Sequence, residues 1–140
     1  MMSKAKVNFP RFGSYNVAAR HIIKNGLDCD YIDAPPTTKK TLELGTKNSP
    51  DFVCTPFKYQ LGGYIEAIEA GADVLIQVGG LCRLGYYGEL HEQILRDLGY
   101  KVKFVNMANA DFSKPMTFYD EFKKLNPKLS IKKITSACLV

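Results

Sequence analysis

Short apolar segments alternate with stretches of helical periodicity over the first 105 residues, and this alternation restricts the fold more than any other feature. The apolar segments cover residues 6–9, 31–34, 51–54, 73–78 and 101–105. Strands that alternate with helices in this way form a parallel sheet covered on both faces. Because crossover connections are right-handed, we expect a single open, doubly wound, Rossmann-like α/β domain with about five parallel strands in the order 2-1-3-4-5.

The expected helices carry ordinary start and stop signals. Ser14 is a suitable N-cap for a first helix, and Gly26 ends that helix. Thr55 is expected to cap a third helix, and Pro56 falls at the first position of that helix, where its missing N–H is harmless. Gly62 and Gly63 lower the stability of this third helix, and close packing against another backbone explains them best. The remaining helices are expected over residues 37–44, 89–98 and 113–125.

The net charge of +5 lies entirely in the last part of the chain. Residues 1–100 carry eleven basic and eleven acidic groups, and residues 101–140 carry eight lysines against three acidic groups. We therefore expect a Rossmann-like domain over residues 1–112 and a helical, lysine-rich tail over residues 113–140, which could begin a second lobe. The tail has no arginine, so a solvated lysine face is favoured over a nucleic-acid surface.

Other features favour a cytoplasmic protein that binds neither membrane nor nucleic acid. No apolar run approaches the roughly 20 residues that a membrane-spanning helix needs. The first residues have no apolar core of the kind found in secretory signals. The four cysteines form no C-x-x-C pair, and in a reducing compartment they are free thiols, metal ligands or catalytic groups.

Two cysteines follow expected strands and are the candidate metal ligands. Cys54 stands between an expected strand and a helix N-terminus, where the helix dipole favours a thiolate, and Cys82 lies in the loop after the next strand. Adjacent strands are about 4.8 Å apart, so these loops can bring two thiolates to one centre. Free cysteine is more often a small buried side chain, and Cys29 and Cys138 are assigned to that role.

The same loops contain the other candidate ligand-binding residues, which are Ser14, Lys58, Gly79, Gly80, Arg83 and Tyr86. Lys58 and Arg83 can bind an anion, and the two glycines permit close approach of a ligand. Neither nucleotide-binding glycine fingerprint is present. His21 and His91 have no acidic partner at helical spacing and are interpreted as structural or exposed, so no catalytic residue is assigned.

Three segments, residues 49–58, 66–73 and 82–89, carry a family resemblance that extends over roughly residues 5–107. The most specific is Cys82-Arg83-Leu84-Gly85-Tyr86-Tyr87-Gly88-Glu89, and residues 41–45 and 94–100 fit the same pattern. The chain resembles the CoA-protein activase family, whose members are related to activators and components of 2-hydroxyacyl-CoA dehydratases. The resemblance implies a Rossmann-like lobe that holds part of a [4Fe–4S] site. Cys54 and Cys82 match the first two of three cysteine positions.

These observations give a leading hypothesis and two alternatives. The leading hypothesis is part of an iron–sulfur site used in electron transfer to, or dehydration of, an acyl-CoA, with further cluster ligands from another lobe or subunit. As an enzyme, the protein would be a 2-hydroxyacyl-CoA dehydratase-related lyase or its activating component. The first alternative is a non-enzymatic binding or assembly module without a cluster, favoured by a glycine loop shorter than the family's. The second is a redox enzyme that uses Cys54 directly.

Overall fold

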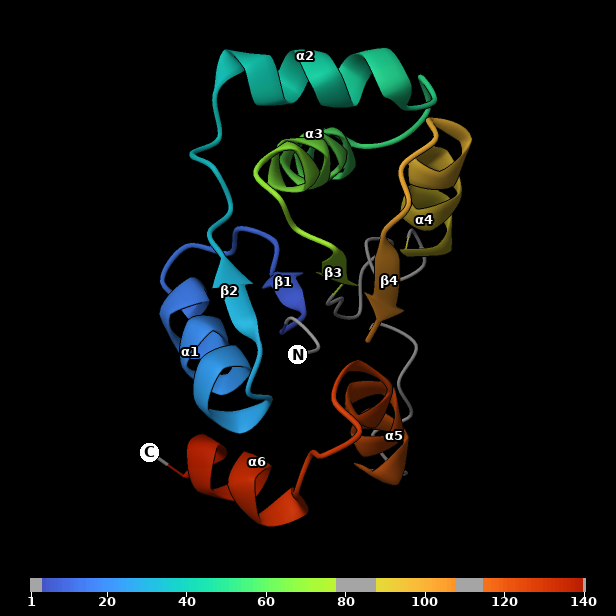
Figure 1. Ribbon diagram of the computed structural model, residues 1–140. Helices are drawn as coiled ribbons and strands as arrows, with labels where there is room; N and C mark the ends of the chain where they lie inside the picture. The colour runs from blue at the N-terminus through green and yellow to red at the C-terminus, as the bar shows by residue number, and fades with distance from the viewer. Residues whose placement is uncertain (1–3, 78–87, 108–114, 140) are drawn as a thin grey trace.

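The computed structural model describes residues 4–77, 88–107 and 115–139, and they form an α/β domain around an all-parallel sheet (Figure 1). Within these residues the sheet has four strands, in the order β2-β1-β3-β4. The strands are β1 Lys6–Asn8, β2 Asp30–Ile32, β3 Val74–Gln77 and β4 Lys103–Asn106. The expected α/β class with a parallel sheet is therefore confirmed, and the strand order reverses between β1 and β3.

Helices occupy the connections and both faces of this sheet. They are α1 Tyr15–His21, which continues as the π-helix η1 Ile22–Gly26, then α2 Lys39–Asn48, α3 Thr55–Glu69, α4 Gly88–Asp97, α5 Pro115–Leu125 and α6 Ile131–Cys138. Residues of α3 and α4 share one buried cluster with Leu75 of β3. Residues of η1, α5 and α6 share a second cluster with Val7 and Val105 on the opposite face. Figure 1 shows the two groups of helices on opposite sides of the strands.

The strand expected at residues 51–54 is wrong, because this segment is a turn between α2 and α3. The Val53 amide donates to the Pro50 carbonyl at 3.4 Å, and no residue of the segment pairs with another strand. Val53 enters the core, whereas the neighbouring Phe52 is 80% exposed. Only residues 49–54 separate the two helices, too few for a strand and the two connections that it would need.

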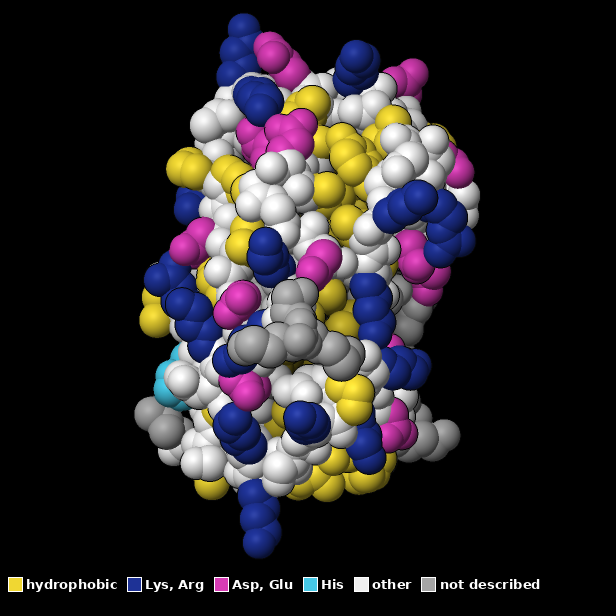
Figure 2. Space-filling model, in the orientation of Figure 1, with side chains coloured by type: hydrophobic (Ala, Val, Ile, Leu, Met, Phe, Trp, Pro, Cys, Tyr) yellow, Lys and Arg dark blue, Asp and Glu magenta, His cyan; other side chains and the backbone are white. Residues whose placement is uncertain are grey.

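The described residues from 115 onward pack against the rest of the domain. Leu129, between α5 and α6, is buried in the cluster that contains Val7. The Asn126 side chain donates to the Leu27 carbonyl at 3.0 Å. On the face shown in Figure 2, basic and acidic side chains are interspersed, and hydrophobic side chains gather over α3 between α2 and α4. None of the helices described is both long and apolar enough to span a membrane.

Candidate functional site

Cys54 is the N-cap residue of α3, and its thiol is exposed to solvent. Its backbone is extended, and its carbonyl accepts hydrogen bonds from the amides of Phe57 at 3.1 Å and Lys58 at 3.3 Å. The side chain makes no capping hydrogen bond. The thiol is therefore accessible to solvent at the N-terminus of a 15-residue helix.

The cysteines assigned to packing differ from each other. Cys29 is buried in the core on the β1 face that also contains Val7, and its thiol donates to the Leu27 carbonyl at 3.5 Å. Burial raises the pKa of this thiol, and the negative charge of Asp28 acts in the same direction. Cys138 is exposed near the end of α6, so its assignment to the core is wrong. The last turn of an amphipathic helix places it on the solvent side.

Five of the candidate residues lie outside the described residues, namely Gly79, Gly80, Cys82, Arg83 and Tyr86. The convergence of Cys54 and Cys82 therefore stays a prediction. In sequence, these residues connect the end of β3 at Gln77 to the start of α4 at Gly88. Among the residues that are described, no three His, Cys, Asp or Glu side chains come together as a metal site.

Ser14 and Lys58 are two further candidate ligand-binding residues within the described part of the chain. Ser14 is the N-cap residue of α1, as expected from the sequence, but it has a helical backbone and its side chain forms no capping hydrogen bond. The side chain of Asn16, in the first turn of α1, accepts from the Phe12 amide at 2.7 Å and so ties the preceding loop to this helix. Lys58 is half-buried on α3, and its backbone carbonyl faces Gly45 of α2.

Three adjacent strands each end in a residue with a carboxamide side chain, and the sequence alone did not predict that these side chains lie in one row. The last residues of β1, β3 and β4 are Asn8, Gln77 and Asn106. The strand register places all three on the sheet face covered by α3 and α4, because Asn8 is opposite Leu75 and Gln77 is opposite Asn106. Tyr64 of α3 donates to the Gln77 side chain at 2.7 Å. The signal was an amide at the end of each strand, but only the register shows that they share a face.

A cavity of about 180 Å³ opens beside the first of these amides. It lies between the chain segments that leave β1 and β2 and the N-terminal half of α3. Its polar lining includes Asn8, Arg11, Thr41, Gln60 and Tyr64. This is the carboxyl edge of the parallel sheet, where open α/β sheets bind their ligands.

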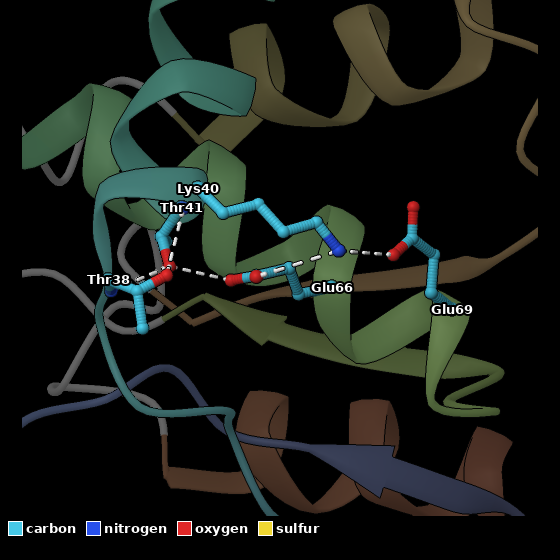
Figure 3. A network of polar contacts seen from close by, with 5 residues as sticks. All are labelled: Thr38, Lys40, Thr41, Glu66 and Glu69. Carbon is cyan, nitrogen blue, oxygen red and sulfur yellow. Dashed lines mark hydrogen bonds and ion pairs between the residues drawn. The ribbon is translucent and has the colours of Figure 1, made fainter.

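A hydrogen-bond network fixes the wall that α2 contributes to this cavity (Figure 3). The Thr41 hydroxyl accepts from the Thr38 amide at 3.0 Å and donates to the Glu66 carboxylate of α3 at 2.7 Å. Lys40 lies 4.0 Å from Glu66 and 3.3 Å from Glu69. Thr41 therefore caps its own helix and ties it to α3.

Replacing Thr41 with valine is expected to lower the free energy of unfolding by about 2 kcal/mol, because a hydrogen bond to a mostly buried carboxylate is lost without a change of shape. Thr46→Val is the matched control, since Thr46 is exposed on the same helix. Urea unfolding of both variants measures the difference. Equal stabilities would show that the network does not hold α2 against α3.

His91 of α4 is fully buried against α3. Its ring stacks on Phe57 with centroids 3.8 Å apart, and Tyr64 meets it edge-on. Nε2 lies 3.3 Å from the Phe57 carbonyl, whereas Nδ1 has no hydrogen-bond partner within the described part of the chain. Burial lowers the pKa of His91 to about 4, against the opposing effect of the Phe57 hydrogen bond. This histidine is a neutral packing residue one turn from the N-terminus of α3.

Comparisons with known proteins match this chain to no family model, no curated protein and no solved structure. The chemical groups of the site itself therefore indicate what it can bind. The structure supplies an exposed thiol at Cys54 and a small cavity lined by an amide and a guanidinium.

Proposed function

We propose that this chain contributes thiolate ligands to an iron–sulfur site in a protein related to 2-hydroxyacyl-CoA dehydratases. The observation that supports this best is the position of Cys54 at the N-terminus of α3, where its side chain is exposed and makes no capping hydrogen bond. Iron–sulfur clusters are held by cysteine thiolates, and the exposed side chain of Cys54 is accessible to such a cluster. Cys82 is the proposed second ligand, since the segment that contains it follows β3 in sequence.

The finer topology belongs to the same proposal. We propose a doubly wound, Rossmann-like arrangement, supported by the strand order β2-β1-β3-β4 and by helices on both faces. In such folds the ligand binds beyond the carboxyl ends of the strands, near the point where the order reverses. That point lies between β1 and β3, and the segment containing Cys82 leaves the sheet from β3.

The proposed ligand set is shared with another lobe or subunit. The described residues fit one thiolate position, Cys54, and Cys82 would add a second, whereas [4Fe–4S] centres usually take four cysteines or a substitute ligand. A bound cluster would supply single-electron chemistry for electron transfer to, or dehydration of, an acyl-CoA. The role of this chain would be to hold the cluster at the carboxyl edge of the sheet.

The proposal predicts that Cys54→Ser and Cys82→Ser each lose most of the iron and sulfide taken up by the chain during anaerobic reconstitution. Serine keeps the size of the side chain but is a much poorer ligand for cluster iron. Cys138→Ser is the matched control, because Cys138 is also exposed but lies in α6. Iron, sulfide and visible absorbance are measured together with thermal stability. Equal iron content in Cys54→Ser and Cys138→Ser would contradict the proposed ligand role.

A non-enzymatic binding or assembly module is the second candidate, and a specific observation favours it. The described residues form a lined cavity at the carboxyl edge of the sheet, which a binding module needs and cluster ligation does not. A folded wild-type chain that takes up no more iron than Cys54→Ser, alone or with candidate partner subunits, would favour this module over the iron–sulfur site.

A further inference from the structure

A buried hydrogen-bond acceptor that has no partner among the described residues belongs to the wall of the cavity at the ends of β1 and β2. Asn8 lines this cavity and is 1% exposed. Its Nδ2 donates to the Ile32 carbonyl at 3.0 Å, which fixes the orientation of the amide. Its Oδ1 has no hydrogen-bond partner in the part of the chain that is described. Buried acceptors in native proteins are almost always paired, so a donor group of a ligand is expected at this position.

A cation also lines the cavity. Arg11 is exposed, lines the cavity, and makes no ion pair with any other described residue. Asp33 lies beside it but pairs with Arg20. A guanidinium binds a carboxylate through two parallel hydrogen bonds. Arg11 is the single charged side chain among the described lining residues, so it matches a monoanion better than a dianionic phosphate.

The walls between these two groups are mainly apolar. Phe12 and Tyr59 contribute partly exposed aromatic rings, and Pro35 and Pro56 contribute rigid apolar surface. The volume of about 180 Å³ lies below the roughly 300 Å³ at which pockets for drug-sized ligands begin. The occupant is therefore a compact molecule, on the order of one ring.

We propose that this cavity binds a small organic carboxylate whose carboxylate pairs with Arg11 and whose hydroxyl or amino group donates to Asn8 Oδ1. The compact apolar body of the molecule packs between the aromatic and proline walls. This site is independent of the iron–sulfur proposal, because it uses neither Cys54 nor Cys82.

Ligand-observed NMR titration of the full chain tests this proposal with matched probes. The probes are 3- and 4-hydroxybenzoate, which carry both groups, benzoate, which lacks the donor, phenol, which lacks the anion, and inorganic phosphate. At least one hydroxybenzoate is expected to bind at least about tenfold more tightly than benzoate or phenol, since an unpaired buried polar group is a strong source of discrimination. Equal binding of a hydroxybenzoate and benzoate, preferential binding of phosphate, or no binding of either hydroxybenzoate would overturn the proposal.

Variants identify the residues responsible. Arg11→Gln is expected to weaken hydroxybenzoate binding by at least about tenfold, because the ion pair is lost, whereas Lys47→Gln, an exposed cation on α2, leaves it unchanged. Asn8→Leu is expected to abolish the preference for hydroxybenzoate over benzoate.

Because a core substitution at Asn8 can impair folding, Gly63→Leu provides a second test. A Cβ at Gly63 meets nothing within 4 Å, so the leucine fills the cavity and should block both ligands. Full binding by Arg11→Gln or by folded Gly63→Leu would place the ligand elsewhere.

Discussion

Replacing Gly62 with alanine is expected to lower the free energy of unfolding by roughly 3 kcal/mol, the upper part of the usual range for overpacking a tight contact. Gly62 lies where α2 crosses α3. A Cβ there would come within 2.8 Å of the Thr41 carbonyl carbon and closer still to its oxygen. Both contacts are backbone atoms of a helix, so relief requires α2 to move away from α3 as a unit.

The adjacent glycine provides a control within the same turn. A Cβ at Gly63 would meet no atom within 4 Å, so Gly63→Ala should raise the unfolding free energy by about 0.5–1 kcal/mol through helix propensity alone. Urea unfolding measures both variants. Similar shifts at the two positions would show that helix propensity, and not the crossing, determines their effect.

Gly45 of α2 makes the second close contact at the crossing of α2 and α3. A Cβ on Gly45 would lie within 3.1 Å of the Lys58 Cα and closer to its carbonyl group. Gly45→Ala should therefore be as destabilising as Gly62→Ala. Because one outward movement of α2 relieves both clashes, the double variant should lose clearly less stability than the two single losses added together.

The parts of the fold that could be predicted have a sequence pattern that does not depend on which other segments pack against them. Val74, Leu75 and Ile76 are a continuous apolar run bounded by helices, and all three are buried, as expected for a central parallel strand. Phe52 and Val53 gave a similar but shorter signal and are in a turn. Short apolar runs cannot be assigned by periodicity alone, and here the lack of room between α2 and α3 decides the structure.

The candidate site was predicted in part for a related reason. The position of Cys54 at the start of a helix follows from local signals, although Cys54 itself is the N-cap and not Thr55 as expected. The amide row did not follow, because an asparagine after an apolar segment usually indicates a turn. Only the strand register shows that the side chains of Asn8 and Asn106 lie on the same face of the sheet. Gly62 was correctly interpreted as a close-packing residue, whereas Gly63 beside it packs against nothing.

Acidification from pH 7 to pH 4 is expected to destabilise the protein through His91 by about 3 kcal/mol, the free energy that corresponds to a pKa of about 4 in the folded state and about 6.5 in the unfolded state. The unfolded chain binds the proton first, so this contribution to stability is complete above pH 6.5. It is lost as the pH falls towards 4, and below that pH both states are protonated and nothing further is lost.

His91→Phe isolates this effect, because phenylalanine keeps the stacking on Phe57 but cannot be protonated. The free energy of unfolding of both proteins is measured from pH 4 to pH 8, and the difference between them removes the contribution of the carboxylates. His21→Gln is the control, since His21 is the other histidine of the chain and lies on α1. A wild-type pH profile parallel to that of His91→Phe would mean that His91 titrates equally in the folded and unfolded states. A wild-type profile that falls more steeply with acid than that of His91→Phe would show that a charged imidazole is disfavoured where His91 stacks on Phe57, in the first turn of α3.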